Sequence, residues 1–171
     1  MTNLDQKLKD TVYLKSENWG KILAISKRQF DEWAIRKLSK EGYADFKMVY
    51  MPVLMNIQVE GTNNNELASH AKVSKQAMNK VVKELLKLGY IQSKPSKEDK
   101  RNTIFTLTER GKKLVIHARL AVKGLMDIYR EHIGQKEFDR TLKTLHHIIV
   151  CFVTDSSREF TFREIDVAES V

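Results

Sequence analysis

The sequence has one cysteine and no long apolar run. Cys151 alone excludes a disulfide within the chain. No apolar stretch reaches the roughly 20 residues that a membrane-spanning helix needs. The first ten residues, MTNLDQKLKD, are too polar for a secretion signal. These absences exclude a disulfide scaffold and favour neither a membrane nor a secreted protein, so we expect a cytoplasmic one.

Patterns that usually carry catalysis or metal binding are also missing. The five histidines show no His-x-x-x-His spacing, and no glycine-rich phosphate loop or nucleophile motif is present. Adjacent His146 and His147 would point about 100° apart on a helix, which makes a shared metal ion difficult. We interpret Cys151, between Val150 and Phe152 on an apolar helix, as a buried and inert thiol. We therefore predict no metal, no cofactor and no enzymatic activity.

Positive charge is abundant and concentrated in one region. The 171 residues carry a formal net charge of +8, and their number is sufficient for one domain with a sizeable core. Residues 66–123 contain 14 Lys and Arg against 5 Asp and Glu, a net charge of +9, so the rest of the chain carries about −1. This distribution is typical of a protein that binds a polyanion.

The region from Asn63 to Gly111 contains a series of local structural signals. Asn63 and Glu66 form the pattern of a capping box at the start of a short helix. After a tight corner at Val73, Ser74 is the expected N-cap of a second helix, which Gly89 should end by adopting a positive φ. The apolar residues of the second helix recur every three or four positions and predict a buried face: Met78, Val81, Val82, Leu85 and Leu86.

The opposite face of this second helix carries amide and ammonium groups. Gln76 and Asn79 have side chains suited to hydrogen bonds with base edges. Lys75, Lys80 and Lys83 are suited to phosphates. Lysines on an isolated helix are usually only a solvated face, but here they occur within an ordered series of signals. We predict that this helix lies in the major groove of DNA, where its N-cap Ser74 also faces the duplex.

A β hairpin is expected after Gly89. Tyr90–Lys94 and Thr103–Leu107 have the composition of two strands, and Thr108 is the expected N-cap of the next helix. The connecting loop is highly charged, and an acidic side chain in it can orient an arginine through a paired-charge contact. This pattern favours a wing that probes the minor groove. The residues predicted to act there are Lys97, Asp99, Lys100 and Arg101.

These elements together resemble the winged helix-turn-helix of the MarR family of transcriptional regulators. The segments NELA and VSKQAMNKVVKELLKLGYI resemble its helix-turn-helix, and DKR followed by LTERG resembles its wing and exit helix. The Asp-x-Arg and Leu-Thr pairs of the family fall, with unchanged spacing, on Asp99, Arg101, Leu107 and Thr108. Outside this region the resemblance is architectural, and it implies N- and C-terminal helices that build a two-fold dimer.

Helical patterns also flank the winged region. We expect helices over 18–40, 45–59 and 109–133 and a further one from Lys136, with Pro52 kinking or interrupting the second. A winged helix is complete without such long helices, so self-association is their simplest additional role. The last helix has apolar positions at alternating spacings of four and three, which form a packing seam: Phe138, Leu142, Leu145, Ile149 and Phe152.

The predicted fold is mainly α with a small β wing, a winged helix-turn-helix flanked by dimerisation helices. The predicted divisions are an N-terminal helical segment (1–44), the DNA-binding region (45–111), long C-terminal helices (112–155) and a polar tail (156–171). From Asp155 onward the chain has five acidic against two basic residues, and we expect it to be partly disordered.

The predicted function is a homodimeric transcriptional regulator, a repressor, that binds a pseudo-palindromic operator in double-stranded DNA. The alternative from another class is a winged-helix module that binds an acidic partner protein. Gln76 and Asn79 favour DNA, because amide groups add little to a purely electrostatic contact. Redox sensing is disfavoured, since the peroxide-sensing members of the resembled family carry a reactive cysteine in the N-terminal helix, which has none here.

The resemblance also implies a small aromatic effector in a cleft between the dimer helices and the winged helix. Aromatic and thioether side chains are available near that junction, with Lys47 or His117 for an anionic group. The alternative is that these side chains are ordinary core. The candidate ligand-binding residues are Trp19, Phe46, Tyr50, Met51, Met55 and His117.

Overall fold

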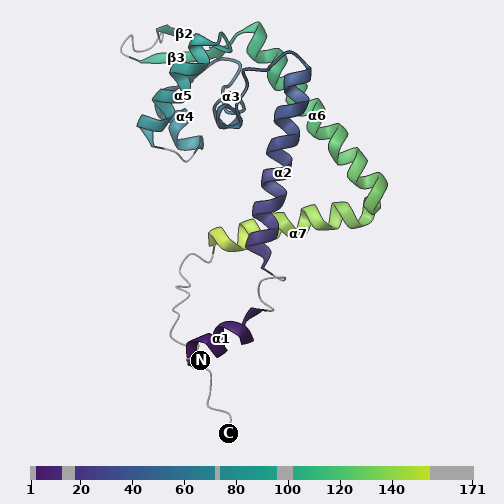
Figure 1. The fold of residues 1–171 in the computed structure, drawn as a ribbon. Coiled ribbons are helices and arrows are strands. Elements are labelled where there is room, and N and C mark those ends of the chain that lie inside the picture. The colour runs from purple at the N-terminus through teal and green to yellow at the C-terminus, as the bar shows by residue number, and fades with distance from the viewer. Residues whose placement is uncertain (1–2, 13–17, 72–73, 96–101, 155–171) are drawn as a thin grey trace. The chain divides into compact units, whose positions relative to one another are not determined.

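The computed structural model describes residues 3–12, 18–71, 74–95 and 102–154 (Figure 1). The chain divides into two compact units, Met1–Val122 and Lys123–Val171. The first contains two N-terminal helices, α1 (Asn3–Asp10) and α2 (Trp19–Lys40), and the winged helix, and α6 begins there. The second contains the end of α6 and all of α7. The elements after α2 are η2 (Met48–Tyr50), α3 (Met51–Leu54), β1 (Thr62–Asn63), α4 (Asn64–Ala71), α5 (Lys75–Lys87), β2 (Ile91–Pro95), β3 (Thr103–Leu107), α6 (Glu109–Ile133) and α7 (Gln135–Thr154).

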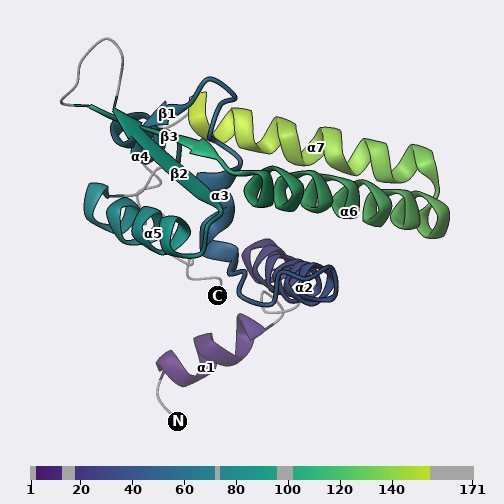
Figure 2. The ribbon, with the colours of Figure 1, turned by 90° about the horizontal axis from the view of Figure 1, so that it is seen from above.

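The wing belongs to a three-stranded antiparallel sheet with the order β1-β3-β2 (Figure 2). The sequence predicted only the two longer strands, and β2 and β3 are present within one residue of the predicted bounds. The additional strand β1 pairs Thr62 with Phe105 and Asn63 with Ile104. Two residues are too short to show an alternating apolar pattern. The predicted hairpin of β2 and β3 is therefore confirmed, whereas β1 was not predicted.

The predicted capping box is confirmed, and Asn63 belongs to the sheet as well. The Asn63 side-chain oxygen accepts a hydrogen bond from the Glu66 amide, and the Asn63 amide donates to the Glu66 carboxylate, both at 3.0 Å. The same residue pairs with Ile104 in β1. The start of α4 is thus attached directly to the sheet.

Both ends of α5 follow the predicted local signals. The Ser74 hydroxyl accepts a hydrogen bond from the Ala77 amide at 3.2 Å. At the other end Gly89 has a φ of 70°. Its amide donates to the Leu86 carbonyl and the Tyr90 amide donates to the Leu85 carbonyl, which is the Schellman arrangement. The predicted core face is also confirmed, because Met78, Val82 and Leu85 are buried and Val81 and Leu86 pack against the same cluster.

The helix predicted over 45–59 is wrong in its length. Only η2 and the single turn of α3 form in this segment. Pro52 lies in the first turn of α3, where a missing N–H costs no helical hydrogen bond. Beyond α3, the buried Thr62 hydroxyl accepts from the Gln58 amide at 2.9 Å and donates to the Asn56 carbonyl at 3.3 Å. These contacts hold the chain in a turn that leads to β1 instead of a continuing helix.

The three long helices agree with their predicted bounds to within one residue. Asn18 caps α2 through a 3.0 Å hydrogen bond from the Lys21 amide, and Gly134 follows α6 with a φ of 96°. Within the second unit, Tyr129 and Phe138 have ring centroids 5.6 Å apart, and Arg130 Nε donates to Asp139 at 3.1 Å. These contacts join the end of α6 to the start of α7. None of the helices in the described ranges is long and apolar enough to cross a membrane.

Candidate nucleic-acid interface

The exposed face of α5 carries the side chains predicted to contact DNA. Gln76, Asn79, Lys80 and Lys83 are all exposed, as is the N-cap Ser74. Because the opposite face of the helix is buried in the core, this face is directed to solvent. The positive end of the helix dipole lies at the Ser74 end, so that end also favours an anion.

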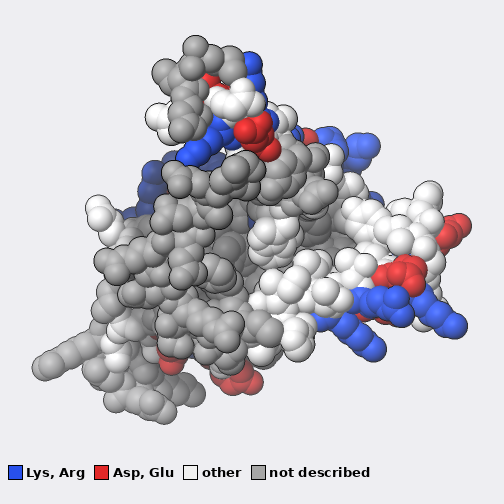
Figure 3. Space-filling view, turned by 90° about the horizontal axis from the view of Figure 1, so that it is seen from below, with Lys and Arg blue, Asp and Glu red and all other residues white. Residues whose placement is uncertain are grey.

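The remaining predicted contacts involve one residue at the start of α5 and four in the wing. The Lys75 side chain and the wing residues Lys97, Asp99, Lys100 and Arg101 lie outside the described residues. Their roles stay predictions. On the face drawn in Figure 3, blue Lys and Arg side chains are interspersed with red Asp and Glu side chains, so the described part of that face is mixed in charge.

The acidic residue of α5, Glu84, is attached to the segment that precedes α3. Its carboxylate accepts a hydrogen bond from the Tyr50 hydroxyl at 2.7 Å and from the Lys47 ammonium at 3.1 Å. These two hydrogen bonds lower the pKa of Glu84 below its ordinary value. The negative charge on α5 is therefore balanced from within the protein.

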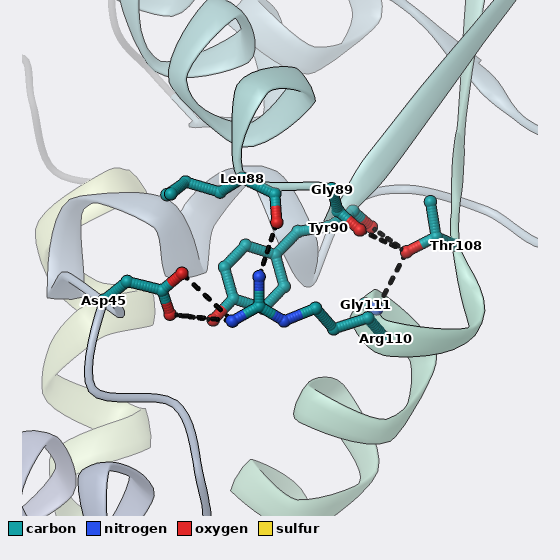
Figure 4. Close-up of polar contacts among 7 residues, drawn as sticks. All are labelled: Asp45, Leu88, Gly89, Tyr90, Thr108, Arg110 and Gly111. Atoms are coloured by element: carbon teal, nitrogen blue, oxygen red, sulfur yellow. Dashed lines mark hydrogen bonds and ion pairs between the residues drawn. The ribbon is translucent and has the colours of Figure 1, made fainter.

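A second polar cluster lies at the C-terminal end of α5 (Figure 4). One terminal nitrogen of Arg110, Nη2, donates to both carboxylate oxygens of Asp45, at 3.0 and 3.1 Å. Nη1 donates to the Leu88 carbonyl at 2.5 Å. The guanidinium carbon lies 4.3 Å from the ring centroid of Tyr90, and the Tyr90 hydroxyl donates to Asp45 at 2.5 Å. Three groups, the Asp45 carboxylate, the Leu88 carbonyl and the Tyr90 ring, thus meet at one arginine.

Burial and hydrogen bonding perturb both acids of this cluster. Burial alone would raise the pKa of Asp45, but the hydrogen bonds from Tyr90 and Arg110 outweigh it and lower that pKa. Burial is the main cause that raises the pKa of Tyr90, and its hydrogen bond to the Asp45 carboxylate adds to the increase. At neutral pH the cluster therefore contains an ionised Asp45, a neutral Tyr90 and a cationic Arg110.

The start of α6 is packed closely against the same turn. The Thr108 hydroxyl accepts from the Gly111 amide at 3.1 Å, which confirms it as the N-cap, and it donates to the Gly89 carbonyl at 2.6 Å (Figure 4). A Cβ atom on Gly111 would lie 2.0 Å from the Tyr90 carbonyl oxygen. A glycine is required there because the two backbones touch.

Neither polar cluster was recognised from the sequence. Asp45 and Arg110 are 65 positions apart, and Tyr50 and Glu84 are 34 apart. No local spacing rule connects residues at such separations. One signal was available in the sequence. Arg110 precedes Gly111 in the LTERG segment, and glycine is unfavourable inside a helix, so its presence there indicates a close contact in the folded protein.

The candidate ligand residues have mixed environments. Phe46 and Tyr50 are buried, with ring centroids 6.3 Å apart, and Met51 is partly buried against the same core. Met55 is exposed, and His117 Nδ1 lies 3.2 Å from the Tyr43 hydroxyl.

Trp19 belongs to the other end of α2. It lies about 28 Å along the helix axis from the buried Leu38, at 1.5 Å per residue. Within one chain Trp19 is therefore not brought to the buried aromatic residues, and Lys47 is already paired with Glu84. Among the described residues, no cluster of three or more His, Cys, Asp or Glu side chains could hold a metal ion.

Comparison with known proteins gives consistent results. Residues 35–102 match the model of the MarR family. The HTH-type transcriptional regulator SarZ of Staphylococcus haemolyticus is 30% identical over 102 residues, which cover 58% of this chain and 67% of that protein. The stretch matched by the family model includes the capping box, α5 and β2.

Solved structures share the fold. A MarR family transcription regulator superposes with a TM-score of 0.70 at 16% identity, covering 92% of this chain and 100% of that one. A MarR variant from E. coli, complexed with operator DNA, superposes with a TM-score of 0.61 at 19% identity, covering 81% of this chain and 97% of that one. With the capped α5, the three-stranded wing sheet and the flanking helices already in place, the chain belongs to the MarR family of winged helix-turn-helix, DNA-binding transcriptional regulators.

Proposed function

We propose that the protein is a homodimeric repressor that binds a pseudo-palindromic operator through α5. The observation that carries this proposal is the exposed face of α5, on which Gln76 and Asn79 lie among lysines while the opposite face is buried. Amide side chains pair well with adenine edges in the major groove, and lysines hold phosphates. We therefore assign base recognition to Gln76 and Asn79 and phosphate binding to Lys75, Lys80 and Lys83.

Exposed apolar side chains on the flanking helices support a dimer. Ile149 on α7 is 61% exposed, and Trp19 on α2 is 52% exposed. Leu142, which lies two members before Ile149 in the predicted seam, is also exposed. Large apolar side chains that are left exposed on a helix often mark an interaction site. In a two-fold dimer the two copies of α5 would be about 34 to 36 Å apart, which corresponds to one turn of DNA.

Selection of bound sequences from random duplexes tests the operator and its symmetry together. We expect an inverted repeat with half-sites about one DNA turn apart. A single asymmetric site, or no enrichment at all, would contradict the proposal. The second outcome would favour an acidic partner protein instead.

Two substitutions on α5 separate base recognition from phosphate binding. Asn79→Ala should reduce the preference for the operator over random DNA by ~1 to 3 kcal/mol. Lys83→Ala should weaken binding to all duplexes alike and lower the magnitude of the log-log salt slope by about 1. If Asn79→Ala weakened operator and random DNA equally, the assignment of base recognition would be wrong.

The wing is proposed to contact the minor groove through Arg101, oriented by Asp99. Arg101→Ala should then reduce operator affinity more than Lys97→Ala, which removes the same charge from the same loop without that orientation. Equal losses in a fluorescence-anisotropy titration would reduce the wing to a general cationic loop.

Repression, and its relief by a small aromatic ligand, are the remaining parts of the proposal. In an in vitro transcription assay with the selected operator overlapping a promoter, added protein should lower the transcript yield.

An aromatic acid would release DNA only if it bound better to a dimer in which the two copies of α5 have the wrong spacing for the operator. Of the candidate residues, Trp19, Met55 and His117 retain accessible surface, whereas Phe46 and Tyr50 would have to leave the core. A titration of aromatic acids monitored by Trp19 fluorescence and by DNA release tests this part.

A further inference from the structure

We propose that Asp45 and Arg110 form a clamp that positions the C-terminal end of α5, and that Arg110 acts in DNA recognition through this clamp and not by contacting DNA. The clamp consists of Asp45, the Tyr90 ring and hydroxyl, Arg110 and the Leu88 carbonyl. The inference rests on the proposal that α5 recognises the operator.

The guanidinium of Arg110 makes contacts with three groups of the protein. It donates from Nη2 to Asp45 and from Nη1 to Leu88, and its face lies over Tyr90. The planar group therefore has both of its terminal nitrogens and one face in use (Figure 4). Such a fork cannot turn toward a phosphate without losing these contacts.

The Leu88 carbonyl is the point at which the clamp holds α5. Leu88 is the C-cap residue of α5, and the last carbonyls of a helix have no partner within the helix. Gly89 and Tyr90 satisfy the carbonyls of Leu86 and Leu85, and Arg110 satisfies that of Leu88. The end of α5 is thereby attached to the first turn of α6.

Through Arg110, Asp45 links the C-terminal end of α5 to the segment that follows α2. It lies five positions after the end of α2, in the segment that also contains Lys47 and Tyr50. Those two residues hold Glu84 one turn earlier on α5. The segment from Asp45 to Tyr50 therefore holds α5 at two successive turns, so it sets the direction of the helix that carries Gln76 and Asn79.

The ion pair of the clamp is too exposed to contribute much stability. The Arg110 and Asp45 side chains are 42% and 34% exposed, and ion pairs with this much solvent contact contribute little to folding. We therefore expect its loss to change DNA recognition more than thermal stability. This expectation separates the clamp from an ordinary core contact.

Removal of the negative charge of Asp45 should raise or lower the affinity for DNA, depending on whether the clamp exists. DNA is a polyanion, so removal of a carboxylate near the interface should by simple electrostatics tighten binding to every duplex. The clamp predicts the opposite for the operator. Asp45→Asn keeps the size of the side chain but weakens its interaction with Arg110. The orientation of α5 should then be less well fixed, and the affinity for the operator should fall.

The experiment measures dissociation constants for operator and random duplexes at several salt concentrations. Asp45→Asn and Arg110→Lys should each lose about tenfold in operator affinity, with random-duplex affinity and salt slope near those of the unchanged protein. Glu109→Gln is the matched control, since that carboxylate pairs only with Lys112 in the described ion pairs and its side chain is 81% exposed. It should keep or slightly increase operator affinity.

Three outcomes would overturn the clamp. The first is operator binding by Asp45→Asn that equals or exceeds that of Glu109→Gln. The second is full retention of operator binding by Arg110→Lys. The third is a salt slope lowered by about one in Arg110→Gln, which would make Arg110 a phosphate contact.

Two further variants keep the result interpretable. If Asp45→Asn melts at a lower temperature, Tyr90→Phe removes only the hydroxyl that donates to Asp45 and should still reduce operator affinity by about twofold to threefold. Asn79→Ala in the same assay tests the underlying proposal by itself. Relaxed specificity in Asn79→Ala, with unchanged operator binding in the clamp variants, would reject the clamp alone.

Discussion

The winged helix and the long helices that flank it in the sequence differ in how far their apolar residues are buried. In α5 the side chain of Leu85 has 0% of its surface exposed, whereas that of Ile149 in α7 is 61% exposed. Helix α6 shows both behaviours, because Leu114 near its start is fully buried and Ile133 at its end is exposed. Both regions have the same kind of helical apolar pattern.

The difference in burial indicates which surface each apolar helix face packs against. The apolar face of α5 packs against the sheet and neighbouring helices of its own chain. Apolar side chains of α2 and α7, among them Trp19 and Ile149, are exposed in the single chain, and a second copy is the partner that we propose for them. The winged helix is thus stabilised by its own contacts, and the flanking helices are expected to complete their packing in the dimer.

The largest expected effect on the free energy of unfolding comes from replacing the glycines of α6. Gly111 lies in the winged helix, and Gly124 lies in the long helical region. Gly111→Ala should destabilise the protein by about 3 kcal/mol or more, because its Cβ would lie 2.0 Å from the Tyr90 carbonyl oxygen. Gly124→Ala is the matched control, since nothing lies within 4 Å of its added Cβ. It should stabilise by about 0.5 to 1 kcal/mol. Urea unfolding measures both values, and equal effects would remove the contrast between the regions.

The next effect concerns the seam on α7. Ile149→Asp should place a charge in the proposed dimer interface and reduce operator affinity about 100-fold, because a monomer engages only one half-site. His147→Asp introduces the same charge about 200° away on the helix and should leave the dimer intact. Sedimentation and DNA titration measure the two consequences. A monomer before substitution, or dissociation by both variants, would contradict the seam.

A smaller effect should distinguish the two helix caps. Ser74 and Asn18 accept equivalent hydrogen bonds from the amide three residues later, at 3.2 and 3.0 Å. Ser74→Ala should reduce the global free energy of unfolding by about 1 kcal/mol, since α5 is part of the core. Asn18→Ala should reduce it less, because the exposed first turn of α2 can open locally. Hydrogen exchange and urea unfolding together measure this difference, and equal global losses would argue against it.

The smallest effect is a pH dependence located in the winged helix. The pKa of Asp45 is lowered in the folded protein, so its contribution to stability is present above its ordinary pKa of 3.8 and is lost as the pH falls through the lowered value. The stability difference between the unchanged protein and Asp45→Asn should therefore be positive at pH 7, below about 1 kcal/mol for so exposed a pair. It should shrink toward pH 3. A constant difference in urea unfolding across this range would exclude the ionised carboxylate as its source.

Signals confined to a few neighbouring residues were predictable. The capping box of Asn63, the cap of Ser74, the glycine stop at Gly89 and the cap of Thr108 all follow from chemistry within five positions of the chain. The buried face of α5 follows from a regular spacing. The exposed face of α5, and with it the candidate interface, is the complement of that buried face.

Other features depended on residues far apart in the sequence. The strand β1 exists because β3 offers it a partner, and the segment after α3 turns because the Thr62 hydroxyl joins two of its backbone groups. The helical pattern over 45–59 was genuine in its apolar spacing, but Pro52 and these contacts decided how much of it became helix.

The sequence by itself determined the series from α4 through the β2–β3 hairpin to α6, the ends of the long helices and which face of α5 is polar, because backbone hydrogen bonding and side-chain periodicity are local. Only the tertiary structure decided that Asp45, Tyr90 and Arg110 meet at the end of α5 and that Glu84 is held by Tyr50 and Lys47. Hydrogen bonds between residues 34 to 65 positions apart form only when the packed core brings their elements together.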